Sequence, residues 1–331
     1  MRAIGETEYQ TQATELVSAP AVRTEGIALS DSSIVFIPYR PSPLGVLRDV
    51  YRHRGLIWSV AVAAFARATK KFRLGATWIV FNTFMSLIGY TLIFGGGVFN
   101  VSTPNHMPYF LYLLVGMMGW RLFQETLKES TRSFLRLRKI VQEFHFPLIL
   151  LPTAGSAYAL FQFVLYVVAY FICLGYYWAT TGTLYAQLSP KLLLMSIGGL
   201  GLCLAFAWGV GLWTAPLTAW ARDVRMVINF AMPFYMFLTP VMYPIERLHG
   251  AMRILAEANP LSSAVEMAKV GLLGAGAVRV DAAIWSISAT FVILVSGMWF
   301  MSRYAHSLAK GMKNAYGGGG DDTDTDDDDM M

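Results

Sequence analysis

Residues 74–120, LGATWIVFNTFMSLIGYTLIFGGGVFNVSTPNHMPYFLYLLVGMMGW, decide the fold, because they contain no Asp, Glu, Lys or Arg. About 20 apolar residues are enough for a helix to cross the hydrocarbon core of a membrane, so this run is too long for one crossing. The turn-like cluster VSTPNHMP at residues 101–108 divides it. The stretch therefore predicts two membrane spans, at about residues 75–99 and 109–127.

Four further apolar runs continue this pattern toward the C-terminus. They predict spans at about residues 148–176, 192–213, 226–243 and 282–301. Helices are expected, because lipid cannot satisfy free backbone groups and the runs are too long for barrel strands. The predicted fold class is an all-α polytopic membrane protein with six transmembrane helices.

The composition supports the same class. Hydrophobic residues make up 55% of the 331 residues and charged residues only 14%, and the mean hydropathy is +0.48. Soluble domains carry about 25% charged residues, and disordered chains are poor in apolar residues, so both classes are excluded. The chain has 26 basic residues and a net charge of +5, which favours contact with anionic lipid rather than nucleic acid.

Two apolar segments are predicted to lie in the membrane surface instead of crossing it. Residues 55–66 are short and have basic residues on both sides, which is typical of an interfacial amphipathic helix. Residues 261–278 are interrupted by Glu266 and Lys269 and are rich in Gly, Ala and Ser. This second segment predicts a pair of re-entrant or interfacial helices before the last span.

The domain organisation follows from these segments and from the positions of the basic residues. We expect a flexible cytoplasmic arm at residues 1–40, an interfacial region at 41–74, six spans within 75–303, and a cytoplasmic C-terminus at 304–331. With both termini inside, 21 of the 26 lysines and arginines lie on the cytoplasmic side, as the positive-inside rule requires. The acidic tail after the glycine run at 317–320 is assigned no role.

The sequence carries no motif of an enzyme. No phosphate-binding loop of the Gly-x-x-x-x-Gly-Lys-Ser/Thr type occurs, so ATP and magnesium would be bound by another chain. The five histidines have no metal-ligand spacing, and no metal or cofactor is expected in this chain. Cys173 and Cys203 lie in apolar spans and are interpreted as small core residues.

Charged residues are expected to avoid the middle of every span, which argues against a proton-coupled carrier. Arg121 and Glu125 come nearest, at i,i+4 near the inner end of the second span. They form either an ordinary intrahelical pair or a charged girdle at a pore mouth. Six aromatic residues are candidates for lining a conduit for sugars, with packing as the alternative. They are Tyr90, Phe94, Trp120, Phe123, Tyr235 and Phe237.

A series of short motifs resembles the permease subunits of type-2 ABC exporters, in the branch that exports O-antigen, teichoic acid and galactan. The motifs are YRHRGLIW (51–58), ARATKKFRLGATW (66–78), GMMGW (116–120), KIVQEFHFPLILLP (139–152), RDV (222–224), TPVMYP (239–244) and NPL (259–261). The ARAT segment and Gly119 depart from the family pattern. The resemblance covers about residues 33–312, and its strength lies in the order and spacing of the motifs.

The resemblance implies a transport subunit of a homodimer in the bacterial inner membrane, with two copies of an ABC ATPase beneath. The implied cargo is a polysaccharide on an undecaprenyl-pyrophosphate type of lipid. The loop after the second span and the turn before the fifth would contact the ATPase. The candidate coupling residues are Arg138, Lys139, Glu143, His145, Phe146, Pro147, Arg222 and Asp223.

Basic residues around the interfacial segment are candidates for binding the lipid pyrophosphate, since charge-assisted hydrogen bonds suit phosphate. They are Arg48, Arg52, His53, Arg54, Arg67, Lys70, Lys71 and Arg73. Attraction to anionic lipid headgroups explains the same residues without a substrate. Three other functions remain open: an ABC permease for lipids or drugs, a flippase or secondary transporter that needs no ATPase, and a polytopic membrane enzyme.

Overall fold

The structure is a computed structural model that describes residues 43–70, 76–96, 99, 101–136, 148–187, 189–221, 223–274, 276 and 278–316. These residues belong to one compact unit, residues 39–331. Every element within the described residues is helical. The predicted arm at 1–40 and the acidic tail lie outside the described residues, as does most of the loop that follows the second predicted span.

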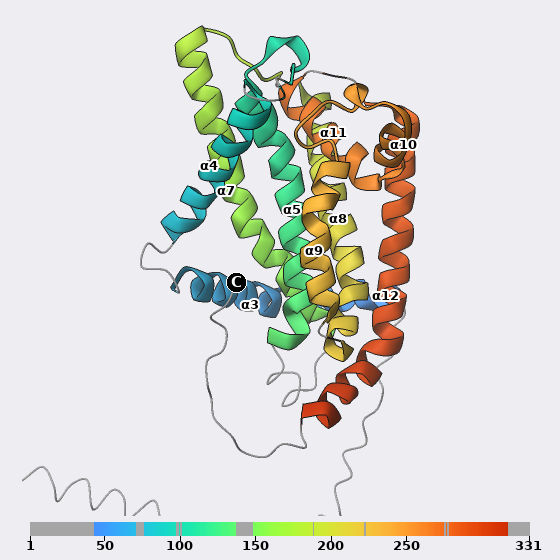
Figure 1. Cartoon of the computed structure of the whole chain (residues 1–331). Coiled ribbons are helices and arrows are strands. Elements are labelled where there is room, and N and C mark those ends of the chain that lie inside the picture. The colour runs from blue at the N-terminus through green and yellow to red at the C-terminus, as the bar shows by residue number, and fades with distance from the viewer. Residues whose placement is uncertain are drawn as a thin grey trace, which may run out of the picture. The chain divides into compact units, whose positions relative to one another are not determined.

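Six helices form a bundle and correspond in order to the six predicted spans (Figure 1). They are α4 (Ala76–Phe94), α5 (Tyr109–Arg136), α7 (Leu150–Thr181), α8 (Pro190–Trp220), α9 (Asp223–Leu238) and α12 (Val280–Tyr316). Within α7, α8 and α12, the stretches Leu150–Thr181, Pro190–Trp220 and Val280–Tyr304 are long and apolar enough to cross a membrane. The chain is therefore a multi-pass membrane protein, and the crossing of α4, α5 and α9 stays a prediction.

Helix α5 is longer than the sequence predicts. The expected span ends near residue 127, but the helix continues to Arg136. Arg121 and Glu125 therefore lie near the middle of a helix of 28 residues. That charges avoid the middle of the span within α5 stays a prediction. The predicted end near residue 127 was too early, because basic and acidic residues usually mark the end of a span.

Two glycines allow close approach of neighbouring helices, one between α7 and α5 and one between α8 and α11. A Cβ atom on Gly155 in α7 would lie 2.7 Å from the backbone carbonyl carbon of Glu129 in α5. A Cβ atom on Gly199 in α8 would lie 2.5 Å from the carbonyl oxygen of Ala264, which belongs to α11 (Pro260–Leu273). Both contacts are closer than side-chain carbons reach, so glycine is required at these two crossings.

The predicted interfacial segment is a helix, α3 (Arg54–Lys70), which follows the short helix α2 (Pro43–Arg52). Figure 1 shows α3 lying across one end of the bundle, beside α7. Its inner side buries Ile57, while Leu56 and Trp58 are 46% and 56% exposed. The predicted amphipathic character is therefore not found, because the exposed side of α3 is itself largely apolar and the charged residues lie at its ends.

Two helices precede the last bundle helix, as expected, but their positions differ from the prediction. Among the described residues of 261–278 the only helix is α11, which ends at Leu273 and is capped by Gly274 with a φ of 66°. Its partner, α10 (Gly250–Ala258), lies before it in the chain. Figure 1 shows both at the end of the bundle opposite α3, and these two ends are called the α11 end and the α3 end. Entry of α10 and α11 into the membrane stays a prediction.

Candidate functional site

One side of α5 carries a continuous row of polar and charged side chains. The row, called the charged face of α5, comprises Arg121, Gln124, Glu125, Lys128, Arg132 and Arg136. Spacings of three and four residues place these side chains on one side of the helix. All are partly or fully exposed, whereas the other side of α5 is buried, including Phe123 and Phe134. The α3-end half of α5 therefore presents charge to an open surface.

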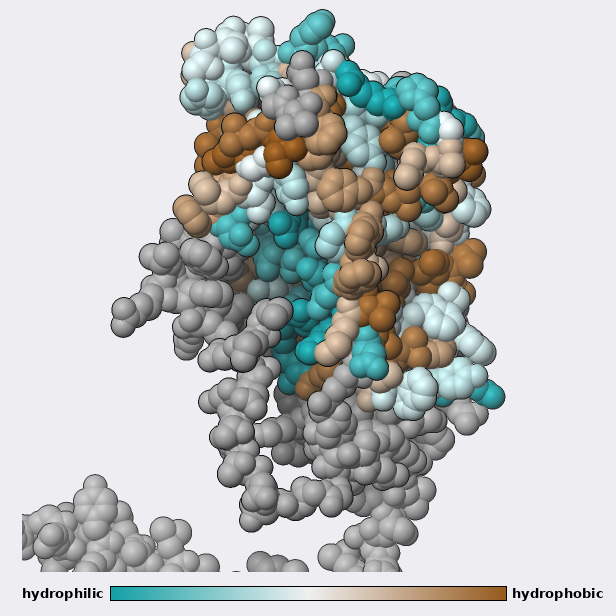
Figure 2. Space-filling model, viewed as in Figure 1, coloured by the Kyte–Doolittle hydropathy of each residue, from teal (hydrophilic) through white to brown (hydrophobic). Residues whose placement is uncertain are grey.

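The charged face lies in a recess between apolar surfaces. Figure 2 shows a hydrophilic strip running over α5, with apolar side chains of α9 beside it. The exposed side chains on α9 include Phe230 and Phe234, at 73% and 64%. A charged strip that faced lipid would be costly, so in a membrane protein such residues face water, a partner or a ligand.

The charged face is only partly neutralised by pairs within α5. Arg121 donates to Gln124 Oε1 at 3.3 Å, and its ion pair with Glu125 is long, at 3.9 Å. Arg136 forms a two-pronged ion pair with Glu129, whose side chain is 7% exposed. Lys128 has no ion pair among the described residues. The face thus retains an excess of positive charge around Lys128.

Two buried guanidinium nitrogens on the same face have no partner within the described part of the chain. They are the Nε atoms of Arg121 and Arg132. A buried donor without an acceptor costs free energy, about 1–3 kcal/mol, unless water or a ligand supplies the acceptor. These donors mark the charged face as a place where an acceptor is missing.

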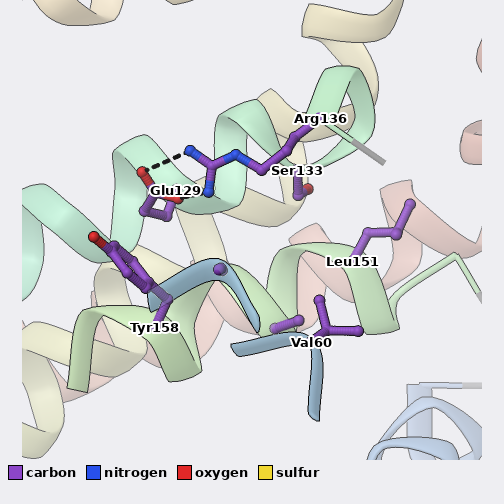
Figure 3. A pocket seen from close by; sticks show the side chains of 9 residues that line it. Val60, Glu129, Ser133, Arg136, Leu151 and Tyr158 are labelled. Atoms are coloured by element: carbon purple, nitrogen blue, oxygen red, sulfur yellow. Dashed lines mark hydrogen bonds and ion pairs between the residues drawn. The ribbon is translucent and has the colours of Figure 1, made fainter. Parts of the chain in front are cut away.

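A small pocket lies behind the charged face, where α3, α5 and α7 meet (Figure 3). Figure 3 shows the Glu129–Arg136 pair on one wall and Tyr158 and Val60 on the others. The lining residues are Val60, Ala64, Glu129, Ser133, Arg136, Leu151, Ala154, Gly155 and Tyr158. The pocket therefore connects the charged face to the helix that crosses the α3 end.

At the α11 end several buried polar side chains have partners within the chain, although the Oγ atoms of Ser262 and Ser263 have none among the described residues. Lys269 is 3% exposed, donates to the carbonyl oxygen of Pro240 at 2.5 Å, and lies 4.0 Å from the ring centroid of Tyr112. Tyr109 donates to the carbonyl oxygen of Met242 at 2.8 Å. These contacts hold the turn that follows α9 against α5 and α11.

Asn259 completes the network of the α11 end. Its Oδ1 accepts from the hydroxyl of Tyr235 at 2.6 Å and from the backbone N–H of Leu261 at 3.0 Å, which caps α11. Its Nδ2 donates to Thr239 Oγ1 at 3.1 Å. One side chain thus joins α9, the turn and α11.

Comparison with known proteins agrees with this arrangement of helices. A family model described as ABC-2 type transporter matches residues 55–273, which is more than half of the chain. This chain belongs to the ABC-2 type transporter family. The O-antigen export system permease protein RfbA of Myxococcus xanthus is 24% identical over 220 residues, which cover 66% of this chain and 80% of that protein. The predicted resemblance to type-2 ABC permeases is confirmed.

Membership of the ABC-2 type transporter family identifies the chain as a transport permease subunit and implies an ABC ATPase as its partner. Asp223 is the one candidate coupling residue among the described residues. It is exposed and begins α9 at the α3 end. The other candidates, Arg138, Lys139, Glu143, His145, Phe146, Pro147 and Arg222, lie outside the described residues.

The basic candidates near α3 are partly described in this ABC-2 permease. Arg48, Arg52 and Arg54 are exposed, and the Arg54 guanidinium lies 4.8 Å from the ring centroid of Tyr51. His53 Nδ1 lies 2.9 Å from the carbonyl oxygen of Asp49. Arg67 and Lys70 belong to α3, without described side chains, and Lys71 and Arg73 lie outside the described residues.

The candidate conduit aromatics differ in their exposure. Trp120 and Phe123 are 1% and 2% exposed, and their rings pack against Tyr235 at centroid distances of 5.9 and 5.6 Å. In this chain the two therefore pack the core and do not face open space. Tyr90 and Phe94 are half-buried against the same core, whereas Phe237 is 51% exposed.

Sequence reasoning missed several polar residues of the site. Lys269 carried a usable signal, because a lysine in an apolar segment is buried only with a partner. Lys128, Glu129 and Arg132 were hidden, because they follow the predicted end of the second span. Their shared side of the helix becomes evident only when α5 is known to reach Arg136.

Proposed function

We propose that this chain is the transmembrane subunit of an ATP-driven exporter for polysaccharide carried on an undecaprenyl-pyrophosphate type of lipid. The observation that carries the proposal is the charged face of α5, recessed between apolar helices in a member of the ABC-2 type transporter family. Hydroxyl-rich sugars need hydrogen-bonding groups along their path, and an otherwise apolar bundle provides them on this face.

The conduit would form between two copies of the chain. Exposed apolar side chains on α4 and α9 flank the charged face and would be covered by the second copy. They include Met85, Ile88 and Leu92 on α4 and Val227, Phe230 and Phe234 on α9. Association through these helices would leave the two charged faces turned toward a shared, water-filled space.

ATP hydrolysis would be coupled through the α3 end. The undescribed segment 137–147 joins α5 to α7, and residues 221–222 join α8 to α9. Leu148 and Ile149, which follow the first segment, are buried in a second apolar cluster with Phe134 of α5 and Ile57 of α3. Movement imposed on the loop by an ATPase would therefore reach several helices together, because packed cores transmit displacement.

The direction of transport follows from the same assignment. The α3 end would be cytoplasmic, with both termini inside and the protein in the bacterial inner membrane. Arg48, Arg52 and Arg54 would meet the lipid pyrophosphate at the membrane surface. The α11 end would be the exit, closed by the hydrogen bonds of Asn259 and Lys269.

Co-purification with a candidate ABC ATPase from the same organism tests the proposal. We expect a stable complex whose ATPase rate rises when undecaprenyl-pyrophosphate-linked glycan is added to proteoliposomes. Drugs and ordinary phospholipids are added in the same ATPase assay, as test substrates for the alternative function of an ABC permease for lipids or drugs. Failure to form a complex would remove the proposal, and stimulation by drugs or lipids alone would assign the rival function.

A further inference from the structure

We propose that Lys128 and Arg132 form a binding site for the phosphate groups of the transported lipid carrier, in the recess beside α5. The inference rests on the proposed function and names phosphate as the chemical group that the charged face of α5 binds. Lys128 and Arg132 are four residues apart on one helix, so their side chains are neighbours. Two cations one helical turn apart can contact the two phosphates of one pyrophosphate together.

The charge balance of the face favours an anion. Glu129 is neutralised by Arg136, and Glu125 is shared between Arg121 at 3.9 Å and the nearby Lys128. No ion pair or hydrogen bond reaches the Arg132 side chain from the described residues, and its Nε is buried without an acceptor. Phosphate oxygens are acceptors that suit a guanidinium well.

The position along α5 also suits a phosphate that enters from the α3 end. At 1.5 Å per residue, Lys128 lies about 29 Å from Tyr109 along the helix, close to the thickness of a hydrocarbon core. Arg121 lies seven residues farther in, which is about 10 Å. Arg132, Lys128 and Arg121 therefore form a row of cations along α5 that begins near the membrane boundary and continues inward.

The arrangement favours the lipid carrier over the headgroup of an ordinary phospholipid. The Arg132 Nε atom is buried and has no acceptor among the described residues. Two adjacent cations match a diphosphate better than a single phosphodiester. Arg52 and Arg54 lie at the same end of the bundle, so a pyrophosphate held there would reach Lys128 next as it moves inward.

Binding of undecaprenyl pyrophosphate to the full chain with its ATPase partner in nanodiscs tests this inference. The test variant combines Lys128→Gln and Arg132→Gln, and a second variant, Lys128→Arg with Arg132→Lys, retains both charges. Lys191→Gln removes an exposed lysine at the start of α8 and is the matched control. Undecaprenol, which lacks phosphate, is the control ligand. Lys128→Gln alone is included as a milder change, so that a double variant that fails to fold does not end the test.

We expect the neutral double variant to bind undecaprenyl pyrophosphate at least tenfold more weakly, since each lost charge-assisted hydrogen bond is worth about a factor of ten. The charge-retaining variant and Lys191→Gln should bind as the wild type does. Binding of undecaprenol should be equal in all variants. Lys128→Gln alone should show a smaller loss in the same direction.

Unchanged affinity in the neutral variants would overturn the inference. If phosphatidylglycerol in the nanodisc abolished binding to the wild type, the face would bind lipid headgroups in general, and the assignment to the carrier would be wrong. A wild-type protein that binds undecaprenyl pyrophosphate no better than undecaprenol would instead contradict the proposed function. The three failures are therefore distinguishable.

Discussion

The two ends of the bundle differ in how their buried charged and amide side chains are paired, although the Ser262 and Ser263 hydroxyls of the α11 end also lack partners in the described residues. At the α11 end, Lys269, Asn259 and Tyr109 each have hydrogen-bond partners within the chain. On the charged face of α5 toward the α3 end, Arg121 and Arg132 keep buried Nε atoms without partners in the described residues. A buried donor without an acceptor costs free energy. The difference therefore indicates that the α11 end is closed and that the charged face of α5 binds a ligand.

The same comparison distinguishes residues that stabilise the fold, at the α11 end, from residues that bind a ligand, on the charged face of α5. Satisfied buried networks hold one conformation, so changes at the α11 end should lower the free energy of unfolding. An unsatisfied buried donor does not stabilise the fold, so changes at Lys128 or Arg132 should weaken binding without lowering the free energy of unfolding.

Asn259→Ala should cause the largest loss of stability, because it disrupts the hydrogen bonds of the α11 end. The substitution removes the acceptor for Tyr235 and Leu261 and the donor to Thr239. We expect the free energy of unfolding to fall by about 3 kcal/mol, measured by denaturant titration in micelles. Asn82→Ala, at an exposed position of α4, is the control and should change little. Equal losses in both variants would contradict the network.

Gly155→Ala should disturb the crossing that positions the charged face. The new methyl group would meet the backbone of Glu129 at 2.7 Å, and we expect a loss of about 2 kcal/mol. Gly201→Ala is the matched control, because a Cβ there meets nothing within 4 Å and alanine favours helix. The same titration should show opposite signs for the two variants, and a stable Gly155→Ala protein would refute the close crossing.

Tyr109→Phe should remove a single buried hydrogen bond, to the carbonyl oxygen of Met242. The expected loss is about 1 kcal/mol. Tyr176→Phe, at a position that is 63% exposed, should leave the unfolding curve in place. If the two phenylalanine variants behave alike, the turn after α9 is not held by α5 through this contact.

The smallest effect is expected for the exposed ion network of α10. A hydrogen bond from Arg253 at 2.9 Å and the charge of Arg279 hold the pKa of Glu257 below its ordinary value. This contribution is present at neutral pH and is lost as the pH falls through the lowered pKa. Protection factors of α10 amides should therefore decrease in acid and in high salt. Glu257→Gln should remove both dependences, and their persistence would contradict the network.

The helices of the bundle could be predicted from the sequence, because charge-free runs and turn clusters mark them directly. The length of α5 could not, since charged residues after residue 120 resemble the end of a span. The burial of Lys269 depends on a carbonyl that lies 29 residues earlier in the chain. The packing role of Trp120 and Phe123 depends on Tyr235. Such contacts between distant residues follow from packing and not from local pattern.

The central claim, that the charged face of α5 is in contact with water, can be tested by cysteine labelling. In a background without Cys173 and Cys203, Lys128→Cys is compared with Ile172→Cys on α7, which is 62% exposed in the isolated chain. A membrane-impermeant, charged thiol reagent applied in native membranes should modify Lys128→Cys at least tenfold faster, because Ile172 would face lipid. Equal or slower modification of Lys128→Cys would contradict the account.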